Sequence, residues 1–330
     1  MFKQHVTYTK DKALKSTFMC FKKLGKLGMI TPKVGFQLFD SYVKPIVNYA
    51  CEIWSTTEYP TLESVQTKFL KMLLGVKSST CNMAMYAETG RYPLHLQHRI
   101  NCIKYWCRLT RLTDDKIVKQ MYNMLRELSD LGFKTWCHQV YSILSDHGFS
   151  HFYNENVCIT KELEAVIVNQ IQLNLFKQFE GNCMISLLNY PVLRTYVKFK
   201  TEFGLEQYLL CIKDYKLRTC LSKIRLSSHD LYIEKGRQLK PKLDENLRIC
   251  QLCKKGIENE FHFVIECYIY NSEREILYNA IKNIEGNLHN LDNTSSFKKL
   301  FMSKNEYTLF ILAKFLNKCL TKRHQLMSLL

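Results

Sequence analysis

The stretch from residue 93 to residue 111 reads PLHLQHRINCIKYWCRLTR. Its aliphatic and thiol side chains recur at helical spacing on one face: Leu96, Ile100, Ile103 and Cys107. Its basic side chains fall on another face, and these are candidate contacts for the phosphates of nucleic acid: Lys104, Arg108 and Arg111. The pattern predicts an amphipathic helix. Tyr105 and Trp106 are more typical of a core than of a base-stacking surface.

The same helical spacing extends along most of the chain. We expect helices over residues 9–27, 62–74, 93–111, 114–130, 134–147, 160–179, 205–223 and 307–316. Another starts at Thr31-Pro32 and ends or kinks at Pro45, and Gly75 closes the helix over 62–74. The remaining predicted helix ends lie near Gly132, Gly148, Gly181 and Gly204. Because strand-like alternation of comparable length is absent, the sequence predicts a mainly α fold.

Charge points to a polyanionic partner. The 330 residues include 47 Lys and Arg against 30 Asp and Glu, a net charge of +17, which attracts nucleic acid from a distance. In the first predicted helix the basic residues recur at helical spacing: Lys12, Lys15, Lys22 and Lys26. This stripe is equally typical of a phosphate contact and of a solvated surface, so both interpretations stay open.

The cysteines indicate a reducing compartment. Most of the 14 stand alone in apolar helical segments and are predicted to be buried thiols, among them Cys20, Cys51, Cys107 and Cys183. The first residues lack the apolar run of a secretory signal, so we expect a nuclear or cytoplasmic protein that is not secreted. The apolar stretch 307–316 is too short and too charged to span a membrane.

Four potential metal ligands lie within eighteen positions. Cys250, Cys253, His262 and Cys267 have the spacing C-x2-C-x8-H-x4-C. Zinc favours a tetrahedral set of thiolate and imidazole ligands, and two residues between the first cysteines suit a tight turn. With four protein ligands the ion keeps no open position for water, so we expect a structural Zn²⁺ and no hydrolytic chemistry there.

A basic segment precedes these ligands. Its candidate phosphate contacts are Lys223, Arg225, Lys235, Arg237, Lys240, Lys242 and Arg248. Tyr232 and Phe261 offer rings on which bases could stack. Any one of these side chains could instead be solvated surface.

Several segments resemble one family. Three segments resemble the C-terminal zinc-binding region of non-LTR (LINE-type) retrotransposon reverse transcriptases: LSSHDLYIEKGR at 226–237, the pair Cys250 and Cys253, and EFHF at 260–263 followed by Cys267. Three upstream segments look like those that follow the polymerase palm in that family: KPIVNYACEIW at 44–54, FLKMLLGV at 69–76 and YAETGRYPL at 86–94. Tyr268 departs from the pattern, since the family often has proline there.

This resemblance implies a multi-helix thumb and connector followed by a small CCHC module and C-terminal helices. The segments expected are a thumb-like region over 1–90, a connector over 91–213, a basic approach and zinc module over 214–275, and a helical end over 276–330. It implies binding of RNA or target DNA, and contact with other parts of such a reverse transcriptase. The alternative is a zinc-stabilised module that binds other proteins or serves only structure, including the case of a retroelement remnant without function.

The resemblance does not imply an enzyme. The catalytic palm and the endonuclease of the family have no counterpart among the predicted elements, so we expect no polymerase activity. Asp114 and Asp115 resemble the aspartate pair of the polymerase hairpin only superficially, because they lie between helical patterns. Asp114 is predicted to cap a helix.

Overall fold

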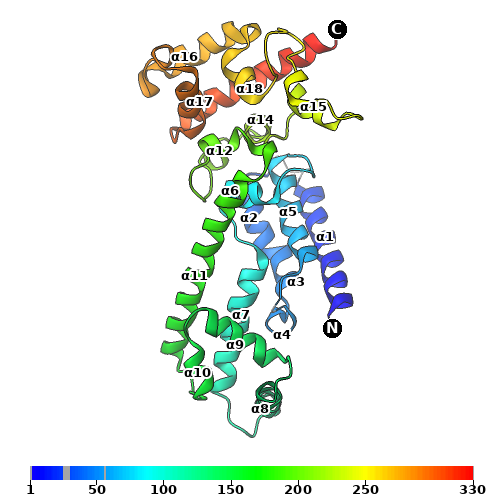
Figure 1. The fold of residues 1–330 in the computed structure, drawn as a ribbon, viewed down its shortest axis with the longest axis vertical. Coiled ribbons are helices and arrows are strands. Elements are labelled where there is room, and N and C mark those ends of the chain that lie inside the picture. Colours follow the sequence, from blue (N-terminus) through cyan, green and yellow to red (C-terminus); the bar gives the residue numbers. More distant parts are fainter. Residues whose placement is uncertain (1, 25–29, 56, 330) are drawn as a thin grey trace. The chain divides into compact units, whose positions relative to one another are not determined.

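The computed structural model describes residues 2–24, 30–55 and 57–329 (Figure 1). Within those ranges the chain forms helices joined by loops, without a β-sheet, and the pairs Thr89–Leu205 and Ile249–Ile257 are isolated bridges. The prediction of a mainly α fold is confirmed. Of the described helices, none is long and apolar enough to cross a membrane.

The helices of the first half of the chain are α1 (Lys3–Leu24), α2 (Pro32–Leu38), η1 (Phe39–Val43), α3 (Lys44–Asn48), α4 (Cys51–Trp54), α5 (Pro60–Leu74), α6 (Asn82–Thr89), α7 (Leu94–Thr110), α8 (Ile117–Asp130), α9 (Trp136–Asp146) and α10 (Ser150–Asn154). Those of the second half are α11 (Lys161–Leu188), η2 (Pro191–Leu193), α12 (Tyr196–Phe199), α13 (Tyr208–Cys211), α14 (Tyr215–Arg225), α15 (Tyr232–Gln238), η3 (Glu245–Leu247), η4 (His262–Glu266), η5 (Tyr268–Tyr270), α16 (Asn271–Glu285), η6 (Leu288–Asn290), α17 (Asn293–Met302) and α18 (Glu306–Met327).

The helix ends follow the sequence signals in part. Gly75 has a φ of +67°, which a glycine adopts without strain, and it ends α5 as predicted. Pro45 lies in the first turn of α3, directly after the wider turns of η1. Helical turns continue from Pro32 through Pro45 to Asn48, so Pro45 does not end the helix; the change from the wider turns of η1 to those of α3 falls one residue before it. The end of the first predicted helix, with Lys26, lies outside the described residues.

Three local predictions are wrong. Gly181 lies inside α11 rather than at a helix end, because the helix continues to Leu188. The helix predicted over 205–223 is broken between α13 and α14, where the extended Asp214 caps the second helix by accepting from the backbone N–H of Leu217 at 2.8 Å. Asp114 does not cap α8, whose N-cap residue is Lys116.

The chain divides into two compact units. Unit 1 comprises Met1–Phe21, Leu38–Thr67 and Tyr92–Asn182, and unit 2 comprises Lys22–Gln37, Lys68–Arg91 and Cys183–Leu330. In unit 1, α7, α8, α9 and α11 enclose a core around Trp106, whose indole N–H donates to the hydroxyl of Tyr122 at 3.2 Å. Trp106 and the thiols of Cys20, Cys51 and Cys107 are buried, as predicted.

In unit 2 the long helix α18 forms the centre of the C-terminal part. Helices α13, α14, α16 and α17 pack against it, and Figure 1 shows α18 running between α16 and α14. The predicted helix over 307–316 is thus confirmed and is longer than expected. Leu312, Leu316 and Cys319 form its buried face. This packing provides the support on which the Cys and His residues are held.

Candidate functional site

The four predicted metal ligands come together in unit 2. One potential ligand atom from each of Cys250, Cys253, His262 and Cys267 lies within 4.8 Å of the others, and all four residues are buried. The Cys253 Sγ and the His262 Nε2 are 3.2 Å apart. Such separations suit ligands arranged around one tetrahedral ion. The four residues therefore form a Cys3His group whose geometry can hold a metal ion.

The chain around the first two cysteines is folded as a tight knuckle. The backbone N–H of Cys250 donates to the carbonyl of Gly256 at 2.7 Å, and that of Lys254 donates to the carbonyl of Cys250 at 3.0 Å. Lys254 has a φ of +58°, which turns the chain back on itself. The backbone N–H of Lys255 lies 3.5 Å from the Cys253 Sγ and stabilises negative charge on it. Both sulfurs are thereby aimed at one point.

The imidazole of His262 is fixed from both sides. Its Nε2 faces Cys253, while its Nδ1 lies 3.3 Å from the Glu266 carboxylate. A carboxylate on the far nitrogen is the usual arrangement that orients a metal-binding histidine. A Cβ added to Gly256 would lie 3.2 Å from the His262 Nδ1, so the glycine gives the ring its room.

The thiols already share protons unequally. A hydrogen bond from Cys267 lowers the pKa of the Cys250 thiol, and the same bond raises the pKa of Cys267. Burial would lower the pKa of His262, but its contacts with Cys250 and Glu266 raise it. Crowded groups that compete for protons in this way are stabilised when a cation replaces those protons.

Glu258 ties the knuckle to the rest of unit 2. Its carboxylate is buried and accepts two hydrogen bonds of 2.7 Å from Arg323 on α18. The same carboxylate accepts from the backbone N–H of Tyr232 at 2.6 Å and lies 3.8 Å from the Cys250 Sγ. One side chain thus links α15, α18 and a metal ligand.

The residues that carry the family resemblance form a second buried network. His229 Nε2 lies 2.8 Å from Glu260, which also accepts from the hydroxyl of Ser227 at 2.7 Å. Arg194 contacts both Glu260 and Glu234, each at 3.2 Å. Burial would raise the pKa of Glu260, but its contacts with His229 and Arg194 lower it to about 2. These side chains have a structural role.

The predicted phosphate contacts need two corrections. Arg225 is buried, and its guanidinium donates to Glu88 at 2.6 Å, to Glu206 at 2.7 Å and to the carbonyl of Phe301 at 2.8 Å. Arg248 is also buried and donates to the carbonyls of Leu243 and Ile233. Their donors are already used inside the protein, so neither arginine reaches a phosphate.

The other predicted contacts are accessible to different degrees. Lys235, Lys240 and Lys242 are exposed, and Lys223 is half-buried. Arg237 is half-buried and donates to Glu234 at 2.6 Å, which neutralises part of its charge.

The three candidate contacts of the amphipathic helix lie in unit 1. Lys104 and Arg108 of α7 are exposed, whereas Arg111 forms an ion pair with Glu164 at 2.7 Å.

One exposed aromatic residue beside the Cys3His group, Tyr268, was not among the rings predicted from the sequence to stack bases. Tyr268, next to the ligand Cys267, keeps 48% of its surface exposed, and the Lys255 Nζ lies 5.1 Å from its ring centre. Its place where the family that this segment resembles often has proline was the available signal. Of the two rings predicted to stack bases, Phe261 packs against the core residue Phe297 at 5.4 Å, and Tyr232 is half-buried.

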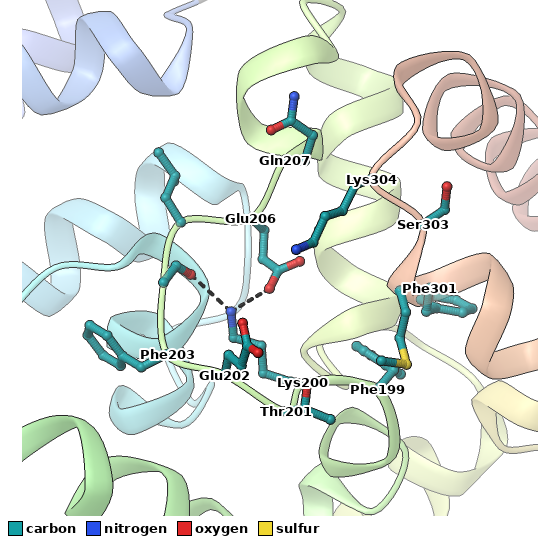
Figure 2. Close-up of a pocket in the computed structure, with 13 residues that line it drawn as sticks. Phe199, Lys200, Thr201, Glu202, Phe203, Glu206, Gln207, Phe301, Ser303 and Lys304 are labelled. Atoms are coloured by element: carbon teal, nitrogen blue, oxygen red, sulfur yellow. Dashed lines mark hydrogen bonds and ion pairs between the residues drawn. The ribbon is translucent and has the colours of Figure 1, made fainter.

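Unit 2 also contains a cavity of about 390 Å³ between the loop after α12 and the end of α17 (Figure 2). In Figure 2 the Lys200 Nζ bonds to the Gly204 carbonyl, at 2.9 Å, and to the Glu206 carboxylate. Since Glu206 also pairs with Arg225, the wall of this cavity is the edge of the buried ion network. Lys200 and Glu206 are thus paired inside the protein, whereas Glu202 and Lys304, which also line the cavity, are exposed.

Comparison with known proteins gives no relative: no family model matches the chain, and neither a curated protein nor a solved structure matches it.

Proposed function

We propose that the Cys3His group binds one structural Zn²⁺ and that the module closed by this ion binds RNA or single-stranded DNA. Three sulfur ligands and one imidazole favour zinc over the hard cations magnesium and calcium. Zinc supplies folding energy to a short, loop-rich segment that has little core of its own. For zinc-finger peptides this contribution is about 10 kcal/mol near neutral pH.

One observation carries the proposal of nucleic-acid binding. The exposed ring of Tyr268, which follows the last ligand, lies beside Lys255, which lies between the second and third ligands. Proteins that hold single strands combine aromatic faces, on which bases stack, with cations that contact the phosphates. Lys254 and Lys255 are exposed within a few residues of two ligands. The loop that leads into the module adds Lys240 and Lys242.

The distribution of charge supports the same proposal. Among the described residues the buried basic side chains are Lys119, Lys200, Arg218, Arg225, Arg248, Arg274 and Arg323, and the buried acidic ones are Glu88, Glu234, Glu258, Glu260 and Glu273. Burial therefore removes similar numbers of both signs, and most of the net charge of +17 stays at the surface. A surface of this charge attracts a polyanion over several ångströms.

We further propose that the chain corresponds to the C-terminal part of a non-LTR reverse transcriptase and is itself without polymerase activity. The order of the resembling segments supports the first statement. In support of the second, the Cys3His group is the one cluster of three or more potential metal ligands in the described part of the chain. A polymerase needs carboxylates that hold two metal ions.

Zinc content tests the metal assignment. Purified protein should contain one zinc per chain by elemental analysis. Cys253→Ser and His262→Ala should lose the metal and expose the segment 250–267 to protease. Cys102→Ser, which removes a buried thiol of unit 1, is the control and should retain the metal. Unchanged zinc in both ligand variants would overturn the assignment.

Salt dependence tests nucleic-acid binding. The logarithm of affinity for a single strand should fall with the logarithm of salt concentration, with a slope of about −0.7 for each phosphate contacted. Replacing Lys235, Lys240 and Lys242 with alanine should flatten this slope by about 2 if all three make contacts. The matched control replaces the exposed lysines 134, 161 and 177 of unit 1. Equal effects of both triples would refute a localised site.

A further inference from the structure

An apolar stripe lies on the outward face of α8 in unit 1. The exposed fractions are 72% at Ile117, 54% at Met121, 52% at Met124 and 74% at Leu131, and Leu128 between them is half-buried. Soluble proteins seldom expose so many large apolar side chains on one element, and such patches mark interaction sites. We call these five residues the α8 seam.

The opposite face of α8 is firmly anchored. Tyr122 is buried and accepts from the indole of Trp106, and the Lys119 Nζ donates to the carbonyl of Leu109 at 3.1 Å. The helix is thus held within unit 1 by one face only. Because this attachment fixes its rotation, the α8 seam is presented outward as a rigid surface.

The spacing of the seam is that of a coiled coil. Its members at 117, 121, 124, 128 and 131 are separated by four, three, four and three residues, which is the heptad repeat. A helix with this repeat buries its stripe against a second helix that carries the same repeat. The occupant of the seam is therefore expected to be a helix with apolar residues four, three and four positions apart.

We propose that the occupant is a second copy of this chain, paired through antiparallel α8 helices. The intervals four, three and four between residues 117 and 128 are the same read from either end. A two-fold axis midway along this segment places Ile117 opposite Leu128 of the second copy, and Met121 opposite Met124. These four apolar side chains then meet one another, as a two-fold interface requires, while Leu131, the residue that follows α8, lies beyond the paired segment.

The polar flank of the seam agrees with this pairing. Gln120 and Glu127, both exposed, occupy the positions beside the seam that face each other in an antiparallel pair. The Gln120 amide already donates one N–H to the Asp114 carbonyl at 3.0 Å, and its second N–H can donate to Glu127 of the second copy. No like charges are opposed. The antiparallel arrangement also places each positive helix N-terminus beside a negative C-terminus.

The pair is expected to be reversible. The 14 residues of α8 span about 21 Å, so the contact covers two heptads only. Interfaces below about 1,000 Å² are typical of weak or transient association. This inference is independent of nucleic-acid binding, because α8 contributes none of the proposed phosphate contacts.

Sedimentation velocity over a range of protein concentrations tests the proposal. Nuclease-treated protein in high salt excludes dimers bridged by nucleic acid. The full chain should shift from monomer to dimer as concentration rises, and a variant with Met121→Lys and Met124→Lys should stay monomeric. Since both methionines are exposed, the variant should fold, and unchanged tryptophan fluorescence confirms this.

A mixing experiment gives the positive test. The double lysine variant and a second variant, with Met121→Glu and Met124→Glu, should each be monomeric alone and should form a heterodimer when mixed at low salt. A wild-type chain that remains monomeric at every concentration overturns the proposal. So does a dimer that survives both double variants. A monomer that binds anionic lipid vesicles through Met121 and Met124 would assign the seam to a membrane surface instead.

Discussion

Arg225 gives the sharpest test of the structure, because the sequence alone suggested a surface role for it. The substitution Arg225→Ala removes two contacts with Glu88, one with Glu206 and one with the Phe301 carbonyl, and it leaves the fully buried carboxylate of Glu88 without its main cation. Burial would raise the pKa of Glu88, and it is the charge of Arg225 that keeps this pKa lowered. Breaking a buried pair in this way costs about 3–5 kcal/mol. That is a large part of the stability of an ordinary domain.

The assay must report on unit 2 alone. All three tryptophans, Trp54, Trp106 and Trp136, belong to unit 1, so their fluorescence does not follow the change. Hydrogen exchange measured by mass spectrometry on peptides of α6 and α14 reports the change directly, because both helices belong to unit 2. Exchange there should accelerate strongly in Arg225→Ala.

Two companion variants control the Arg225 experiment. Exchange should be nearly normal in Lys223→Ala, which changes a half-buried neighbour on the same helix. The double change Arg225→Met and Glu88→Gln should recover part of the loss, since no buried charge remains unpaired. If Arg225→Ala exchanges like Lys223→Ala and instead weakens RNA binding, the buried assignment is wrong.

Two further predictions concern histidines. Burial lowers the pKa of His98 to about 4, below its usual 6.5. As pH falls, the unfolded chain therefore binds the proton before the folded one. The free energy of unfolding of unit 1 should fall by about 3 kcal/mol between pH 6.5 and pH 4. Denaturant unfolding followed by tryptophan fluorescence should show this loss, and His98→Gln should remove most of it; an unchanged pH dependence would contradict the cause. At the metal group, Glu266→Gln should weaken zinc binding about tenfold, because a neutral amide orients His262 less strongly than a carboxylate. Competition with a chromophoric chelator measures this, and wild-type affinity would show that Glu266 has no such role.

The sequence predicted the helical fold well because periodicity is a local property. Helix α7 was predicted within one residue at each end, and the stop at Gly75 follows from its backbone freedom alone. Gly181 shows the limit, since packing of the surrounding residues holds α11 continuous where the glycine alone would weaken it. The division into two compact units is not local at all, as each unit combines three separate stretches of chain.

The metal group could be predicted because its ligands lie close together in sequence and only a few residue types bind such an ion. The phosphate contacts could not be separated from structural arginines by the same means. Arg225 has partners 137 and 19 positions away, Glu88 and Glu206, and composition around position 225 gives no sign of either. The sequence around a basic residue does not show whether its charge faces water or a buried carboxylate.

The motif that resembles the retrotransposon family therefore argues for a fold more directly than for an activity. His229, Glu234 and Glu260 are buried: His229 pairs directly with Glu260, and Arg194 links Glu260 to Glu234. Gly236 leaves room for the Arg248 side chain, which lies 2.7 Å from where a Cβ would be. The proposed binding of nucleic acid must instead depend on exposed groups, and Tyr268, where the chain departs from the pattern of the family that it resembles, is one of them. Substitution of buried motif residues should therefore unfold unit 2, whereas Tyr268→Ala should leave it folded with its zinc and lower affinity for single strands.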